Sequence, residues 1–465
     1  MDSYKSCGNG HNFGSDDFVV FPVDIGQQRL LNYELLFNLF QGLKQSSNLV
    51  NDLKSIYEEV RNASGNIDTV LERCNYNCVD FIFNLIGSCD KATEEIALSL
   101  VTKLIGNSIL IGNYLQNNLK IFVYLLKNPD NLVCTCSLIC RTIKMNRNIA
   151  KILAIDYNYI GLIIEEIPRF DGHENLFMLF SLMELIFKNL EHDHFYTEIN
   201  GVPLIKIPIF TLQQYIFSDD IILLESVLGI FDILLKYWIY GINNIFSEEV
   251  FKRILLLIKE SNKIDIIGNN VLLDHLLNII NICLVTFIKA VSRKDLIEEL
   301  INSLFYQLRK SPGSFQKILS FFSNIAYYKE TSKYIFNSEL IPFLMKQYNN
   351  MSYNIKESFL FIFCNASINN PNKILEIKDM NKVLIDCFDI ANSLRSKKLC
   401  VLFMKAIYSI FSEDNDTVEI FDKSEIIEFL EDIKNSPDHD LFSCANILLE
   451  DFFIDYDERP DKLFI

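Results

Sequence analysis

The chain has 465 residues, about three times the usual length of a single domain, with 50% hydrophobic residues and a formal charge of −17. This apolar content excludes a disordered chain, and the 16 glycines and 10 prolines are too few for a collagen-like, linker-rich or β-sandwich protein. The negative charge argues against a nucleic-acid-binding protein, because a phosphate backbone requires a basic surface. The composition predicts an all-α protein whose helices are joined by short polar turns.

The negative charge is concentrated at the C-terminal end. Residues 411–465 carry 17 acidic and 4 basic residues, a net charge of −13, whereas the first 410 residues have a net charge of −4. We expect long-range attraction to bring a basic partner to this end first.

Residues 1–30 are predicted to be a flexible segment with only two basic residues, Lys5 and Arg29. Residues 1–14 contain no apolar run, so we expect no signal peptide. The most apolar run, residues 276–291, has 16 residues, fewer than the about 20 that a membrane span requires. We predict that this run is a buried core helix and that no membrane is among the partners.

The 12 cysteines suggest neither a metal site nor a disulfide framework. Cys134, Cys136 and Cys140 lie in an apolar helical run, whereas zinc-binding cysteines occur in paired, turn-rich knuckles, so buried thiols are the favoured interpretation. His192 and His194 lack accompanying ligands and are better explained by a loop between helices. No catalytic motif is present, so we predict no enzyme, no metal and no cofactor.

A helical repeat runs along the chain. Its clearest helix has a predicted buried face made of Phe315, Ile318, Leu319, Phe322, Ile325 and Ala326. Ser320 and Asn324 lie on the opposite face of that helix, four residues apart. Phe361 and Asn365 repeat this spacing 41 residues later.

Extending the spacing in both directions gives one equivalent position in each unit: Thr102, Thr142, Glu184, Asp232, Asn281, Asn324, Asn365 and Ser409. The gaps between them, 40 to 49 residues, are typical of helical solenoids. The longest gaps allow for inserted loops, one of them expected at residues 200–208. We predict about ten three-helix units over residues 31–453, stacked into one continuous core, and an acidic tail over residues 454–465.

Several stretches resemble importin-α, the armadillo-repeat adaptor for nuclear import. The sequence KESFLFIFCNASINN is similar to that family's KEAxWxxSN(x)T motif, with Phe361 at the Trp position and Asn365 at the Asn position. The other similar stretches are residues 93–106, 318–344, 404–411 and 424–453, the last of which matches the terminal unit that precedes the family's acidic tail. The resemblance implies a right-handed superhelical armadillo solenoid, located in the cytoplasm and the nucleus.

In the importin-α family, Trp and Asn residues line a concave groove, where Trp rings hold lysine stems of a basic peptide and Asn amides bind its backbone. The resemblance implies a peptide-binding groove formed by Asn281, Asn324, Asn365, Phe361 and Ser320. Two alternatives remain open, because an Asn near a helix end is often a cap residue and because Phe361 could be buried in the core.

The sequence departs from the family pattern in its first half. The expected Trp and Asn positions hold, in order, Leu98 and Thr102, Leu138 and Thr142, Glu184, and Asp232. The principal peptide site is therefore largely lost, and the two acids are either groove acids for a basic ligand or solvated charges. The single tryptophan, Trp238, lies outside the ladder and is predicted to be a packing residue. Residues 1–30 also lack the family's basic importin-β-binding segment.

Two functions follow from these residues. The first is an importin-α-like nuclear import adaptor that binds basic extended peptides of cargo proteins, with importin-β and an export factor as further partners that the resemblance implies. The second is an armadillo-repeat protein-interaction scaffold that has lost transport. Because the resemblance is densest in the units that carry the three Asn residues, the sequence favours the adaptor.

Overall fold

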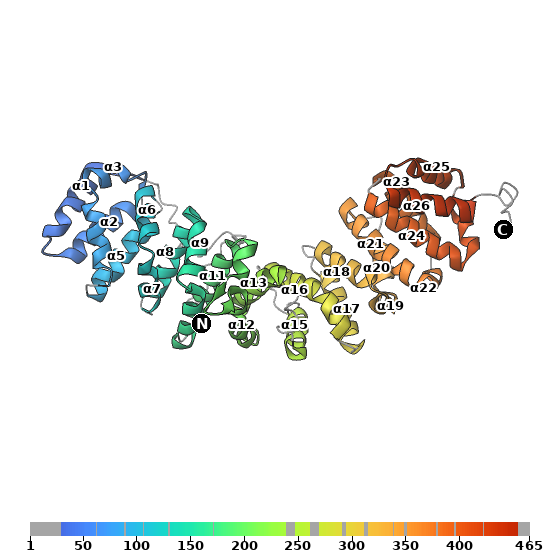
Figure 1. Ribbon diagram of the computed structural model, residues 1–465, viewed down its shortest axis with the longest axis horizontal. Coiled ribbons are helices and arrows are strands. Elements are labelled where there is room, and N and C mark those ends of the chain that lie inside the picture. The colour runs from blue at the N-terminus through green and yellow to red at the C-terminus, as the bar shows by residue number, and fades with distance from the viewer. Residues whose placement is uncertain are drawn as a thin grey trace. The chain divides into compact units, whose positions relative to one another are not determined.

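The computed structural model describes residues 29–453 (Figure 1), apart from residues 62, 88–89, 106, 129–130, 171, 239–246, 261–268, 291–293, 311–314, 338, 348–350, 378–379, 395–396 and 422. The predicted tail over residues 454–465 and all but the last two residues of the predicted segment 1–30 lie outside the described residues. The chain divides into two compact units, Met1–Ile245 and Phe246–Ile465.

The first unit is built around a stack of long helices, in which each one lies beside the next: α2 (Leu49–Arg61), α5 (Lys91–Leu104), α8 (Leu132–Met145), α11 (His173–Lys188) and α13 (Ile221–Tyr237). Shorter helices precede them: α1 (Tyr33–Gly42), α3 (Asp68–Arg73), α4 (Asn77–Leu85), α6 (Ile109–Asn117), α7 (Lys120–Leu126), α9 (Asn148–Lys151), α10 (Tyr159–Glu166) and α12 (Ile209–Tyr215). Single-turn helices fill the connections: η2 (Leu43–Gln45), η4 (Ile152–Asp156), η5 (Ile167–Arg169), η6 (His192–Tyr196) and η7 (Leu204–Lys206).

The second unit repeats this arrangement with the stacked helices α16 (Asn269–Ala290), α18 (Phe315–Tyr327), α21 (Tyr353–Asn369), α24 (Lys397–Glu413) and α26 (His439–Leu448). The other described helices of this unit are α15 (Glu248–Glu260), α17 (Lys294–Lys310), α19 (Lys329–Asn337), α20 (Leu340–Gln347), α22 (Pro371–Leu375), α23 (Met380–Leu394), η11 (Asn415–Ile420), α25 (Lys423–Lys434) and η12 (Leu449–Phe453). Some of these repeating elements have two helices before the stacked one, whereas α17 alone precedes α18.

The predicted all-α fold is confirmed. Strands in the described residues are two-residue pairs: β1 (Arg29–Leu30) runs parallel to β2 (Ala63–Ser64), and β3 (Glu198–Ile199) runs antiparallel to β4 (Val202–Pro203). The β3–β4 hairpin and η7 form the insertion that the sequence predicted at residues 200–208. The eight positions assigned to the repeat fall on eight successive stacked helices, α5 to α24.

The cores of the units follow the helical periodicity. In α18, Ile318, Leu319 and Phe322 have no exposed surface, as predicted, and neither does Phe321, which the spacing had not placed in the buried face. Of the described apolar side chains of the run 276–291, those of Leu276, Leu277, Ile279 and Ile280 are buried in α16, and that of Ile282 is half-buried. In the part of the chain that the structure describes, no helix meets the length and apolarity that crossing a bilayer requires.

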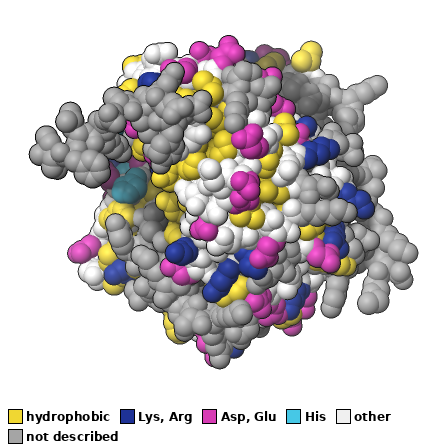
Figure 2. Space-filling model, turned by 90° about the vertical axis from the view of Figure 1, so that its right-hand side faces the viewer, with side chains coloured by type: hydrophobic (Ala, Val, Ile, Leu, Met, Phe, Trp, Pro, Cys, Tyr) yellow, Lys and Arg dark blue, Asp and Glu magenta, His cyan; other side chains and the backbone are white. Residues whose placement is uncertain are grey.

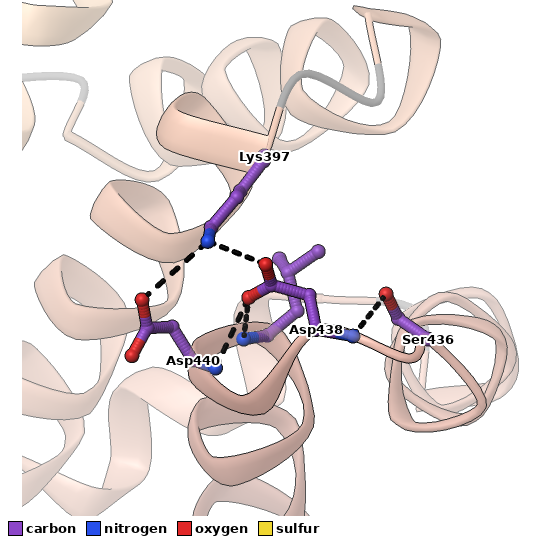
Figure 3. A network of polar contacts seen from close by, with 5 residues as sticks. Lys397, Ser436, Asp438 and Asp440 are labelled. Atoms are coloured by element: carbon purple, nitrogen blue, oxygen red, sulfur yellow. Dashed lines mark hydrogen bonds and ion pairs between the residues drawn. The ribbon is translucent and has the colours of Figure 1, made fainter.

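Aspartates are the N-cap residues of several helices, where their carboxylates accept hydrogen bonds from the first backbone N–H groups. Asp90 caps α5 and Asp220 caps α13 in this way. Asp438 caps α26 and also pairs with Lys397 at the start of α24, while Asp440 lies 3.6 Å from the same ammonium (Figure 3). The bond from Lys397 lowers the pKa of the Asp438 carboxyl. One lysine therefore ties the beginnings of two neighbouring stacked helices together.

Another ion pair lies near the C-terminal end of the chain, in α25. Figure 2 shows acidic and basic side chains interspersed with apolar ones on the described part of the face that it views. Lys434 lies 3.6 Å from Glu431, within α25. Ion pairs thus offset part of the negative charge that the sequence concentrates in residues 411–465.

Side chains from one repeating element also donate hydrogen bonds to the last carbonyls of a helix in the element before it. The last four carbonyls of a helix lack intrahelical donors. Arg141 donates to the Thr102 carbonyl near the end of α5, and Gln307 donates to the Ile258 carbonyl near the end of α15. Asn369 does the same for α18, where its Nδ2 lies 2.8 Å from the Ala326 oxygen and 3.1 Å from the Tyr327 oxygen.

Replacing Asn369 by alanine is expected to lower the free energy of unfolding by about 1–3 kcal/mol, because carbonyls of α18 lose their donor inside a helix contact. The measurement is urea unfolding followed by circular dichroism. The control is Asn354→Ala. Asn354 is exposed at the beginning of α21, the helix that ends with Asn369, and its replacement removes no side-chain hydrogen bond. Equal destabilisation by the two substitutions would contradict the capping role of Asn369.

Candidate peptide-binding surface

The predicted asparagine ladder can be followed on the adjacent helices α16, α18 and α21. Asn324 is exposed on α18, opposite the buried face, as the repeat predicted. Its Nδ2 donates to the Oδ1 of Asn281 on α16 at 3.1 Å, so the structure brings these two predicted residues together. Among the described side chains, no hydrogen bond uses the Asn281 Nδ2 or the Asn324 Oδ1, which leaves one amide donor and one amide acceptor.

Asn365 is placed differently from Asn324. Only 8% of its surface is exposed, because its turn of α21 is buried on every side, from Ile362 to Ser367. α21 lies between α18 and α24 and also contacts α19, α22 and α23. The structure therefore does not bring the Asn365 side chain to the exposed surface that Asn324 occupies.

Ser320 and Phe361 lie one turn before Asn324 and Asn365 on their helices. Ser320 is exposed, on the same face as Asn324. Phe361 is half-buried, between the two outcomes that the sequence left open, and the ammonium of Lys398 on α24 lies 5.1 Å from its ring centroid. Leu277, the corresponding residue of α16, is buried. We call Asn281, Ser320, Asn324, Phe361 and Lys398 the asparagine surface.

The corresponding positions of α5 and α8 offer nothing to a ligand. Thr102 and Thr142 are buried, and their hydroxyls donate to the Leu98 and Leu138 carbonyls of their own helices at 2.8 and 2.7 Å. Leu98 and Leu138 have no exposed surface. These helices carry no counterpart of an aromatic slot or an exposed amide at those positions.

The predicted equivalence of Glu184 and Asp232 is wrong by about one helical turn. A hydrogen bond of 3.1 Å between Ser181 and Ser226 fixes the register of α11 against α13. In this register Glu184 faces Gly229, where a Cβ atom would lie only 2.5 Å from the Glu184 Oε1. The two assigned positions are 48 residues apart, whereas the two helices contact each other at an offset of 45 residues, from Ser181 to Ser226.

Both acids are also less accessible than either of the two predictions for them assumed. Glu184 pairs with Lys188 at 2.8 Å and Asp232 with Lys236 at 3.3 Å, and the two carboxylate side chains are 14% and 5% exposed. Trp238 follows α13, half-buried, with the Lys206 ammonium 5.6 Å from its ring.

The cysteines and histidines do not converge in the described residues, where no group of three or more His, Cys, Asp or Glu side chains could hold a metal ion. Cys136 and Cys140 are buried in α8, and burial raises the pKa of the Cys140 thiol to about 12. His192 pairs with Asp193 at 3.3 Å, and His194 accepts from the Glu191 backbone. Thiols with raised pKa values are poor nucleophiles, so these residues suggest no reaction.

Sequence reasoning missed two residues that shape this region. Asn369 holds α18 and α21 in register, yet it looks like the other asparagines of an Asn-rich sequence. Lys398 faces Phe361 from the next stacked helix, 37 residues later in the chain. A Lys at this distance from an aromatic residue carries no signal until the register between the helices is known.

No protein-family model matches the chain, and no curated protein matches it in sequence. Among solved structures, the chain is similar to one from work on a conserved phosphorylation switch that controls the interaction between cadherin and β-catenin, with a TM-score of 0.57 and 11% identity. The match covers 90% of this chain and 94% of that one. At this identity the likeness concerns the fold, and it supports importin-α no more than other armadillo-repeat proteins. The protein thus has the all-α, armadillo-repeat solenoid fold that the sequence predicted.

Proposed function

We propose that this protein is a protein-interaction scaffold, without catalytic activity, that binds an extended polypeptide segment at the asparagine surface. The observation that carries this proposal is the pairing of half-buried Asn281 with exposed Asn324, which leaves a spare amide donor and a spare amide acceptor on adjacent helices. A peptide unit needs one acceptor for its N–H and one donor for its carbonyl. The pair therefore matches the backbone of any extended segment, whatever its sequence.

The surface beside the pair suits side chains of limited size and charge. Ser320 adds a small hydroxyl on the same face of α18, and Phe361 adds the edge of an aromatic slot. The Lys398 ammonium already lies over the Phe361 ring, so an incoming lysine has to displace it. A ligand with acidic or neutral side chains at this point avoids that cost, which favours the scaffold over an adaptor dedicated to basic peptides.

The nuclear import adaptor is a more specific version of this proposal, in which the bound segment is a basic cargo peptide. It rests on the resemblance of the second unit to importin-α and on the positions of Asn281, Asn324 and Phe361. It requires binding of basic cargo peptides, transfer between cytoplasm and nucleus, and coupling to importin-β and an export factor. A pull-down with importin-β and cell fractionation address these requirements directly.

The test is titration of fluorescein-labelled peptides of about 12 residues, long enough to cross three stacked helices that lie about 10 Å apart. Three peptides of equal length carry basic, neutral or acidic side chains. We expect the Asn281→Ala/Asn324→Ala variant to bind its preferred peptide about 10- to 100-fold more weakly than the wild type, since two hydrogen bonds of about 1 kcal/mol each are lost.

The matched control is Asn354→Ala, which removes an exposed amide from α21 outside the asparagine surface. Its affinity is expected to equal that of the wild type. A preference for the basic peptide would support the adaptor, and a preference for either other peptide would support the scaffold alone. Equal affinity of the wild type and the double variant for all three peptides would contradict peptide binding at this surface.

A further inference from the structure

Cationic side chains gather in the first unit where α2, α5 and α8 end. Arg61 is the last residue of α2, Lys103 lies in the last turn of α5, and Arg141 lies one turn before the end of α8. α5 is next to both α2 and α8 in the stack. The Arg141 Nη1 donates to the Thr102 carbonyl oxygen at 2.9 Å, which brings the guanidinium beside Lys103. We call Arg61, Lys103 and Arg141 the helix-end cluster.

Carboxylates do not neutralise this cluster. In the described part of the chain, Lys103 and Arg141 form no ion pair, and Arg61 has only Glu58, an exposed carboxylate 3.8 Å away in its own helix. Burial lowers the pKa of Lys103, and the nearby charges of Arg141 and Arg61 lower it further. A lysine shifted in this direction by its neighbours lies in a positive potential that no acid relieves.

The cations at the ends of α11 and α13 differ from this cluster. Lys188 pairs with Glu184 at 2.8 Å, and Lys236 pairs with Asp232 at 3.3 Å. The helix dipole favours a cation at every helix C-terminus, so position alone explains why all five helices carry one in their last turns. The dipole does not explain why Lys103 and Arg141 lie together without a carboxylate. An external anion is the missing component.

We propose that the helix-end cluster binds an acidic, extended segment of a partner protein. Stacked helices lie about 8–10 Å apart, and an extended chain advances about 3.3 Å per residue, so carboxylates at every third position of the segment meet successive helices. Arg141 keeps guanidinium N–H groups beyond the one that Thr102 accepts, and a guanidinium can bind a carboxylate through two of them. Lys103 adds a compact charge beside it.

The partner is a polypeptide rather than a nucleic acid, since the net charge of −17 repels a long polyanion while a few carboxylates can approach a local cluster. The site lies in the first unit, on other helices than the asparagine surface. It is therefore an addition to the proposed function, and each of the two can fail without the other.

The probe is a fluorescein-labelled peptide of repeated Glu-Ser-Gly, and the comparison peptide has Gln in place of Glu. The wild type is expected to bind the Glu peptide and to bind the Gln peptide at least about tenfold more weakly. Affinity for the Glu peptide is expected to fall as the ionic strength rises from about 0.01 to about 0.15 M, since the Debye length shortens from about 30 to about 8 Å. The Asn281→Ala/Asn324→Ala variant is expected to retain this binding.

The variant Lys103→Gln/Arg141→Gln is expected to bind the Glu peptide at least about tenfold more weakly than the wild type. Its control, Lys120→Gln/Lys127→Gln, changes the net charge equally at exposed positions in and after α7. Lys103→Gln alone keeps the bond from Arg141 to Thr102 and tests the site without loss of that cap. Lys103→Glu is expected to restore binding to a peptide in which Lys replaces one central Glu.

Equal affinity of Lys103→Gln and the wild type for the Glu peptide would overturn the proposal. So would the absence of binding at low ionic strength, or tighter binding of a single-stranded RNA than of the Glu peptide.

Discussion

Replacing Phe322 by alanine is expected to lower the free energy of unfolding of the second unit by about 3–5 kcal/mol. Phe322 has no exposed surface, and its helix α18 contacts α16, α17, α19 and α21, so the cavity left by the ring is enclosed on several sides. The ring centroid of Phe321 lies 6.1 Å from that of Phe322. The Phe321 ring is also fully buried and has little freedom to move into the cavity. The measurements are urea unfolding and hydrogen exchange of the peptide that covers residues 315–327.

Tyr327→Ala is the control for Phe322→Ala, because Tyr327 is in the same helix and 66% exposed. We expect it to change the free energy of unfolding by less than about 0.5 kcal/mol. If Phe322→Ala costs no more than this control, the assignment of the buried face of α18 is incorrect.

Replacing Phe403 by alanine is expected to cost a similar amount, about 3–5 kcal/mol, and to loosen the C-terminal end of the second unit. Phe403 is 1% exposed on α24, and its ring centroid lies 6.2 Å from that of Phe388 and 6.5 Å from those of Phe421 and Phe429. Loss of the ring removes buried area and aromatic pairs that join three helical segments. Hydrogen exchange in α25, which contains Phe429, is expected to accelerate.

Phe442→Ala is the matched control for this cluster, because Phe442 is an aromatic residue of α26 that is 45% exposed. Its effect on unfolding is expected to be a fraction of that of Phe403→Ala. Unchanged exchange in α25 after Phe403→Ala would show that the aromatic rings do not hold the end of the unit together.

The fold followed from the sequence because the apolar spacing of each stacked helix is an intrinsic property of that helix. In α18 the predicted face is buried from Ile318 to Ala326, whereas Phe315, at the start of the helix, is half-buried, and Asn324 on the opposite side is exposed. The contacts between helices were harder to predict from the sequence, because they depend on the offset of one helix along the next. The bond between Ser181 and Ser226 sets this offset for α11 and α13, and neither serine stood out in the sequence.

The candidate site illustrates the same difference. The pairing of Asn281 with Asn324 agrees with the repeat spacing, and it leaves Asn324 exposed and Asn281 half-buried. Asn365 has the same place in the spacing, yet it is covered, because the whole turn from Ile362 to Ser367 is buried in a helix that contacts α18, α19, α22, α23 and α24. Spacing along the chain reports the side of a helix, whereas exposure depends on what lies over that side. The helix-end cluster was equally invisible, because its members belong to three separate helices.

The direction of the capping contacts between repeating elements has a consequence for synthesis. Arg141, Gln307 and Asn369 each complete a helix that was translated before them, by about 40 to 50 residues. During synthesis, which proceeds from the N-terminus, α5, α15 and α18 thus remain without these donors until the following helices have left the ribosome. Each of these helices therefore reaches its final stability only after the next repeating element has been synthesised. A truncated chain is accordingly best ended after a helix that supplies a cap, so that the helix before it is complete.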